Sequence, residues 1–139
     1  MSDSLLPFIM KWASFFFFLV AAVVHIYFFV LESILFQKTE GFKLFKMTQE
    51  NHAAVKPWAF NQGFYNLLLA LGTLKGLHFV LQKQVMQAGL ITGFCGASMI
   101  VAGLALWYSV PKMRKAALIQ IIPPLLGFVF LSFHIFRSI

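Results

Sequence analysis

Charged residues divide the chain into four long apolar stretches. Uncharged runs of 20, 18, 28 and 21 residues lie between Lys11 and Glu32, Lys56 and Lys75, Lys83 and Lys112, and Lys115 and Arg137. About 18 to 20 apolar residues are enough for a helix that crosses the roughly 30 Å hydrocarbon core of a bilayer. The pattern therefore predicts four transmembrane helices, over residues 12–36, 58–79, 86–110 and 116–136.

These apolar stretches are predicted to be helices because lipid cannot satisfy the open edge of a strand, and only helices and closed barrels span a bilayer. The chain has too few short alternating segments for a barrel, and it contains no linker or internal repeat. We expect one all-α domain over residues 1–139, a four-helix transmembrane bundle. Pro123 and Pro124 lie near the middle of the last helix, where two missing backbone donors predict a kink.

The composition excludes a soluble domain. Hydrophobic residues make up 60% of the chain and charged residues only 11%, whereas soluble domains carry roughly 25% charged residues. The net charge is +7, but no basic stretch is dense enough to follow a phosphate backbone, so we expect no nucleic-acid partner. The single cysteine, Cys95, excludes an internal disulfide, and no His or carboxylate pair has metal-ligand spacing. We expect no metal and no cofactor.

Basic residues in the short loops predict the orientation of the helices. Seven lie in the first and third connections, namely Lys38, Lys43, Lys46, Lys56, Lys112, Arg114 and Lys115, and four lie on the other side, namely Lys11, Lys75, Lys83 and Arg137. Cytoplasmic loops are enriched in Lys and Arg, so we expect both termini outside the cytoplasm. Residues 41–50 alternate apolar and basic positions, which is typical of an amphipathic segment on the inner leaflet but also fits a solvated loop.

The ionisable residues inside the predicted spans point to a site. Glu32 is the only acidic residue within a span, and His25 precedes it by seven residues. Seven residues are almost two helical turns, so both side chains are expected on one helix face, about 10 Å apart along the axis. Because inserting a charge into a bilayer is unfavourable, such residues face the bundle interior or a cavity. The pair predicts an acid/base pair or proton relay; the alternative is a polar network that fixes helix register.

Polar residues from other helices are expected at similar depth. At 1.5 Å per residue, Glu32, Asn61, Gln62 and Gln120 share a layer about 6 Å inside the inner interface. Asn66, about 12 Å deep, is expected to bridge Glu32 and His25. We predict a polar pocket walled by the first, second and fourth helices, with the double proline as its floor. Its catalytic residues would be Glu32 and His25, and its ligand-binding residues Asn61, Gln62, Tyr65, Asn66 and Gln120.

Glycines form a stripe along one face of the third helix. Gly89, Gly93, Gly96 and Gly103 follow at spacings of 4, 3 and 7 residues, including a GxxxG motif. Small residues at such spacings allow two transmembrane helices to approach closely. The stripe predicts either packing against another helix of the chain or a homodimer.

The motifs resemble those of a known family. The segment HIYFFVLESILF from His25 to Phe36, GFKLF from Gly41, NQGFYNLLLALG from Asn61, the Ala102–Gly103 pair and QIIPP from Gln120 are similar to small bacterial membrane proteins of the domain-of-unknown-function 1304 family. The resemblance extends over nearly the whole chain. It implies a four-helix protein of the cell (inner) membrane and supplies no activity.

Three functions are compatible with the sequence. The first is a binding or catalytic pocket for a small amphipathic or lipid-like molecule, in which Glu32 and His25 move protons, as an isomerisation would require. The second is a proton-coupled small-molecule exporter that acts as a dimer, because small multidrug exporters also combine four spans with a glutamate in the first. The third is a structural or accessory membrane subunit.

Overall fold

The fold consists of helices throughout the part of the chain that the computed structural model describes, residues 5–38, 43 and 47–138. The first helix, α1, covers Leu5–Phe29 and continues as a π-helical turn, η1, over Val30–Leu35. The others are α3 (Gln49–Leu81), α4 (Val85–Ser109), a short 3-10 turn η2 (Pro111–Met113) and α5 (Arg114–Ser138). Four helices are long and apolar enough to cross a membrane, which confirms the predicted all-α class with four spans.

The helices extend beyond the uncharged runs from which they were predicted. The first begins at Leu5, seven residues before the expected position, and the second begins at Gln49 and continues through Pro57. The side chain of Thr48 accepts a hydrogen bond from the backbone N of Asn51 at 3.3 Å and so caps α3. A helix outside the hydrocarbon tolerates polar residues, which explains why hydropathy alone placed these boundaries too late.

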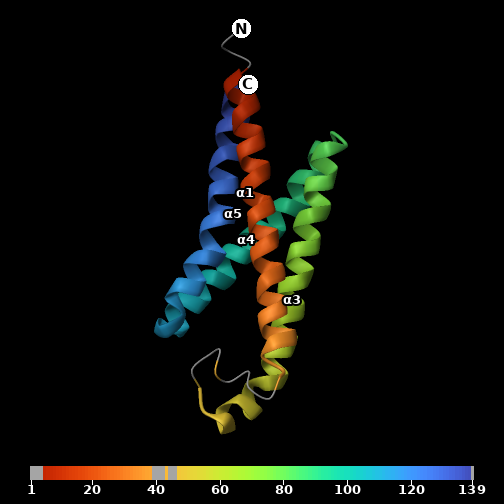
Figure 1. The fold of residues 1–139 in the computed structure, drawn as a ribbon. Helices are drawn as coiled ribbons and strands as arrows, with labels where there is room; N and C mark the ends of the chain where they lie inside the picture. The colour runs from red at the N-terminus through yellow and green to blue at the C-terminus, as the bar shows by residue number, and fades with distance from the viewer. Residues whose placement is uncertain (1–4, 39–42, 44–46, 139) are drawn as a thin grey trace.

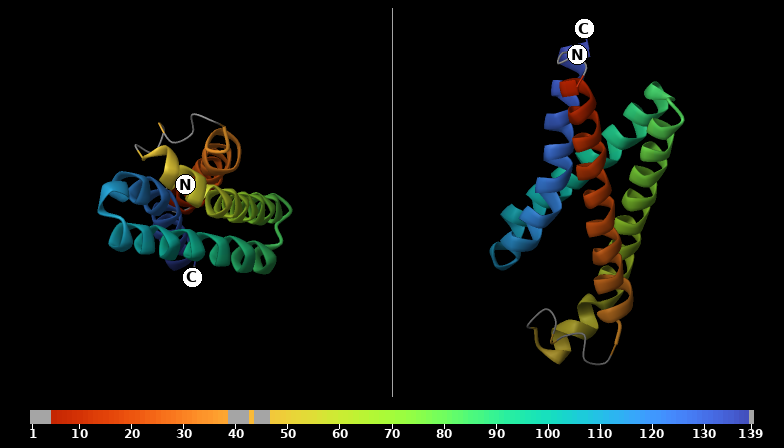
Figure 2. Two further views of the ribbon diagram at one scale, coloured as in Figure 1. Left: turned by 90° about the horizontal axis from the view of Figure 1, so that it is seen from below. Right: turned by 45° about the horizontal axis from the view of Figure 1, so that its top comes forward.

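The four helices form a ring in the order α1, α3, α4, α5, in which neighbours in the sequence run antiparallel (Figures 1 and 2). The chain termini lie together at one end, which we call the termini end, and the connection between η1 and α3 lies at the other, the loop end (Figure 1). At the termini end α1 packs along α5, where Ser14 Oγ donates a hydrogen bond to the carbonyl oxygen of Gly127 at 2.9 Å. At the loop end α1 and η1 pack along α3.

The glycine stripe of α4 divides between two environments. A Cβ atom on Gly96 would meet Phe18 and Phe128, and one on Gly103 would meet Ile121, so these two glycines pack within the chain. A Cβ atom on Gly89 or on Gly93 would meet nothing within 4 Å. Gly96 and Gly103 therefore contact other helices of the same chain and are not free to contact a second copy. A homodimer stays a prediction.

The double proline bends α5 without ending it. Pro123 and Pro124 both lie inside the helix, and Pro124 is fully buried. The C-terminal half of α5 runs alongside α1, whereas its N-terminal half swings away (Figure 1). Half of the predicted amphipathic segment 41–50, namely residues 41, 42 and 44–46, lies outside the described residues.

Candidate functional site

A cavity of about 340 Å³ lies at the loop end and contains the carboxylate predicted from the sequence. We call it the acidic cavity; it is lined by Glu32, Phe36, Met47, Val55, Trp58, Ala59, Asn61 and Gln62. Three of the predicted site residues therefore line one space. The remaining lining residues are mostly apolar, and sequence reasoning missed them because apolar side chains at a membrane boundary carry no distinguishing signal.

Glu32 is held in place by a neighbour on α3. Asn66 Nδ2 donates a hydrogen bond to Glu32 Oε2 at 2.8 Å, and the Asn66 side chain is only 3% exposed. A hydrogen bond to a carboxylate is roughly twice as strong as one between neutral groups. One carboxylate oxygen is thus fixed by the protein, while the residue as a whole lines the cavity.

A close approach of two helices positions this pair. A Cβ atom on Gly63 would collide with the Ser33 side chain and lie 3.1 Å from the Ser33 backbone N, so only glycine fits at this contact. Ser33 Oγ then donates a hydrogen bond to the carbonyl oxygen of Phe60 at 2.9 Å. Because Glu32 directly precedes Ser33, this contact brings the carboxylate against α3.

Two side chains join the ends of the connection that borders the acidic cavity. Gln37 Nε2 donates to the carbonyl oxygens of Glu32, at 3.0 Å, and Lys56, at 3.1 Å. His52 Nε2 donates to the carbonyl oxygen of Phe36 at 2.6 Å, and the two rings lie 4.5 Å apart. His52 is buried within α3, in the part of the helix that precedes its predicted start at residue 58.

His25 is buried in the bundle and does not join Glu32. It is 0% exposed, and its Nδ1 donates to the carbonyl oxygen of Ala21 at 2.9 Å, one turn earlier on α1. No hydrogen bond to Asn66 is formed in the described structure, and the buried Nε2 has no hydrogen-bond partner there. Asn66 therefore contacts Glu32 as expected, but it does not bridge Glu32 to His25.

The π-helical turn explains part of this separation. The backbone N of Phe36 bonds to the carbonyl oxygen of Leu31 at 2.8 Å, five residues earlier. A π turn contains more residues than an α-helical turn, so residues after Val30 no longer follow the 100° step that placed His25 and Glu32 on one face. π-helical turns occur frequently at functional sites.

Two further predicted residues lie outside the acidic cavity. Tyr65 is 57% exposed, because it precedes Asn66 by one residue and so points to a different helix face. Gln120 is buried on α5 at 6% exposure. Among the described residues, none from α5 lines this cavity, so Gln120 and the double proline do not border it; a pocket that includes the fourth helix stays a prediction. The bend of α5 away from α1 accounts for this (Figure 1).

A comparison with models of protein families shows which family the chain belongs to. A family model described as "Protein of unknown function (DUF1304)" matches residues 19–132. The chain belongs to the DUF1304 family. The matched range includes α3 and α4 completely and parts of α1 and α5, which confirms the resemblance found in the sequence. Comparison with curated proteins found no match, and comparison with solved structures found none.

The chemistry available at this site of the DUF1304 chain follows from its donors and acceptors. Glu32 supplies a carboxylate that accepts hydrogen bonds, and Asn61 and Gln62 supply amides that both donate and accept. Within the described residues, no three His, Cys, Asp or Glu side chains come together as a metal site would require. The arrangement is suited to hold a polar group that donates hydrogen bonds next to an apolar one.

Proposed function

We propose that the acidic cavity binds a small amphipathic molecule whose polar head donates hydrogen bonds to Glu32. The observation that carries the proposal is that Glu32 both lines the cavity and is fixed by Asn66 at 2.8 Å. Asn61 and Gln62 line the same space and are available to orient the head. The apolar side chains of Phe36, Val55 and Trp58 supply the surface for an apolar portion.

An ammonium or hydroxyl head fits this site better than an anionic one. A carboxylate in largely apolar surroundings attracts a cation or a hydrogen-bond donor and repels a phosphate or another carboxylate. A catalytic role, in which Glu32 and His25 move a proton to isomerise the bound molecule, stays a prediction, since no hydrogen bond joins the two side chains in the described structure.

We also propose that the loop end faces the cytoplasm in the inner membrane. The support is the excess of basic residues in the first and third connections over the opposite side. The acidic cavity would then open on the cytoplasmic half of the membrane.

Trp58 provides a reporter for this site, because it lines the acidic cavity and its side chain is 75% exposed. In a Trp12→Phe, Trp107→Phe background, fluorescence of Trp58 would be titrated with an alkylammonium that carries a brominated chain, which quenches tryptophan on contact. We expect saturable quenching. Glu32→Gln should weaken it at least tenfold, because a hydrogen bond to a charged group contributes about 1.5 to 3 kcal/mol.

The matched control is Glu50→Gln, which removes the same charge from an exposed position in the first turn of α3. This variant should quench like the parent protein. Equal quenching of the parent and the Glu32→Gln variant, or equal loss in both variants, would contradict the proposal.

A further inference from the structure

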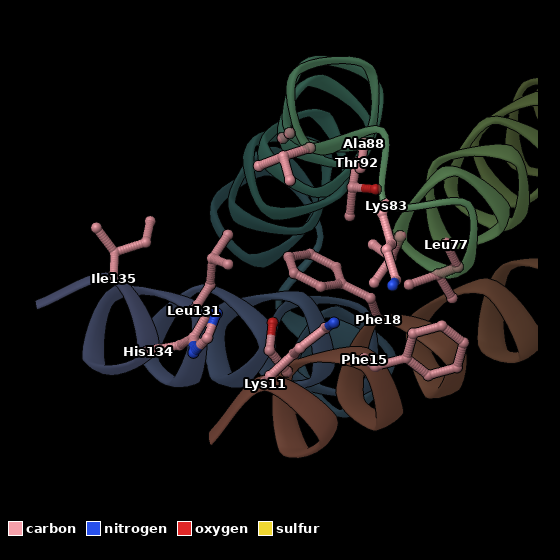
Figure 3. Close-up of a pocket in the computed structure, with 15 residues that line it drawn as sticks. Lys11, Phe15, Phe18, Leu77, Lys83, Ala88, Thr92, Leu131, His134 and Ile135 are labelled. Carbon is pink, nitrogen blue, oxygen red and sulfur yellow. The ribbon is translucent and has the colours of Figure 1, made fainter. Parts of the chain in front are cut away.

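A larger cavity, of about 530 Å³, lies at the termini end and is bounded by all four helices. We call it the basic cavity, because the side chains of Lys11 and Lys83 line it (Figure 3). Most of its other lining is apolar and includes Phe15, Phe18 and Leu77. Among the described residues, none lines both this cavity and the acidic cavity.

The two lysines enter this space from different elements. Lys11 lies one and a half turns inside α1, and Lys83 lies in the turn between α3 and α4. Figure 3 shows both side chains extending into the space between the helices. Lys83 has a φ of 59°, a left-handed conformation that glycine or asparagine adopts more readily than lysine. The turn therefore holds a cationic side chain at a position where a smaller residue would be favoured.

No carboxylate of the described residues neutralises these amines. The acidic residues in the part of the chain that the structure describes are Glu32 and Glu50, and both lie at the loop end. Asp3 falls outside that part. Two positive charges at the edge of an apolar space between transmembrane helices favour an anionic group from the membrane.

The shape of the cavity results from glycines that do not pack. Gly89 and Gly93 line it, and a Cβ atom at either would meet nothing within 4 Å. At Gly76, by contrast, a Cβ atom would collide with Thr92 of the neighbouring helix. Gly89 and Gly93 thus leave a bare wall on α4, along which a chain-like apolar ligand can lie. The volume of the cavity, about 530 Å³, is in the range of ligand pockets.

We propose that the basic cavity binds an acidic phospholipid of the bilayer. The phosphate of its head group would lie between the amines of Lys11 and Lys83, and one acyl chain would lie along the bare wall of α4 and the ring of Phe18. Lysine binds phosphate as a point charge, and its aliphatic stem packs on apolar surface while the amine stays with the head group. This site is independent of the one proposed for Glu32.

The test uses the full chain in nanodiscs of equal parts phosphatidylglycerol and phosphatidylcholine, with bound lipid identified by native mass spectrometry after release. We expect the parent protein to retain phosphatidylglycerol preferentially. In the Lys11→Gln, Lys83→Gln variant the ratio of retained phosphatidylglycerol to phosphatidylcholine should fall by roughly 10- to 30-fold, because each lysine near a membrane surface contributes about a factor of five.

Two controls make the result specific to the cavity. Lys75→Gln, Lys112→Gln removes the same charge from exposed positions that do not line the basic cavity, and it should retain lipid like the parent protein. Gly93→Leu keeps both lysines but fills the cavity, and it should lose the lipid. A Cβ atom at this position meets open space, so the variant should fold like the parent protein, which a circular dichroism spectrum checks.

Several outcomes would overturn the proposal. Equal retention of the two phospholipids by the parent protein would show that the basic cavity has no preference for an anionic lipid. A retained mass equal to that of a free fatty acid would show that the bound anion is a fatty acid and not a phospholipid. Equal loss of lipid in the two double-lysine variants would show that net charge alone, and not the cavity, selects the lipid.

Discussion

The two ends of the bundle hold cavities of opposite character. At the loop end, a carboxylate lines about 340 Å³ of space and is fixed by a hydrogen bond from the adjacent helix. At the termini end, two lysines line about 530 Å³ of mostly apolar space. Gly63 lets two helices touch beside the first cavity, whereas Gly89 and Gly93 leave one face of α4 bare beside the second. Glycine thus allows a close helix contact in one place and leaves open space in the other.

The difference shows how each charge is accommodated in an apolar bundle. Glu32 has a short side chain, so its charge stays within the bundle and requires a partner, which Asn66 supplies. Lysine has a long aliphatic stem, so its amine can reach the head groups while the stem lies on apolar surface. We therefore expect the loop end to be sensitive to hydrogen-bond geometry and the termini end to net charge.

Reversing the charge of the basic cavity should produce the largest change. In the Lys11→Glu, Lys83→Glu variant we expect the ratio of phosphatidylglycerol to phosphatidylcholine retained from mixed nanodiscs to fall by roughly 100-fold, because attraction becomes repulsion. Quenching of Trp58 by the brominated alkylammonium should stay unchanged, since the two cavities share no residue. A change in both readouts would show that the two ends are coupled.

Alanine at two glycines should shift stability in opposite directions. Gly63→Ala places a Cβ atom against Ser33 and should lower the free energy of unfolding by about 1 to 3 kcal/mol. Gly93→Ala enters open space and should raise it by about 0.5 to 1 kcal/mol, because alanine favours a helix more than glycine does. Unfolding in sodium dodecyl sulfate, followed by circular dichroism, measures both. Equal effects would mean that the two ends pack alike.

Removing one hydrogen bond at each end should have a smaller effect. Asn66→Leu leaves the Glu32 carboxylate without its partner and should reduce the free energy of unfolding by about 1 to 2 kcal/mol. Ser14→Ala removes the bond to Gly127 and should reduce it by about 0.6 kcal/mol, a common value for bonds between transmembrane helices. The same unfolding assay applies; a larger loss for Ser14→Ala would reverse the expected order of the two ends.

The smallest effect is expected at Tyr65. Its exposed side chain does not line the acidic cavity, so Tyr65→Phe should change the free energy of unfolding by less than about 0.5 kcal/mol. Alkylammonium quenching of Trp58 should also match that of the parent protein. A marked loss of quenching would place the hydroxyl in the site after all.

The sequence was sufficient to predict the four helices and the proximity of Glu32 to polar residues of α3. Four uncharged runs correspond to four helices, because apolar length determines what spans a bilayer. Depth along neighbouring antiparallel helices placed Glu32, Asn61 and Gln62 together, and Asn66 was also expected to contact Glu32. The rise per residue supplies the heights of these side chains.

Features that depend on helix direction could not be predicted in this way. Gln120 has a suitable height but lies on the half of α5 that swings away beyond the double proline. The separation of His25 from Glu32 involves a π-helical turn, for which the sequence has no clear signal. The basic cavity could not be predicted from its lysines, because lysines near helix ends are common in membrane proteins. It could not be predicted from its glycines either, because their spacing does not tell which of them contact a neighbouring helix.

The unequal lengths of the helices have a consequence for how ligands arrive. The continuous helices Leu5–Leu35 and Gln49–Leu81 have 31 and 33 residues, against 25 for each of the other two. At 1.5 Å per residue the longer pair exceeds the shorter by about 9 to 12 Å, and Figure 1 shows this surplus projecting past the turn between α4 and α5 at the loop end. The acidic cavity is lined by residues near the loop end of the longer pair, so its ligand would arrive from the membrane interface at that end, whereas the ligand of the basic cavity would diffuse in from within the lipid.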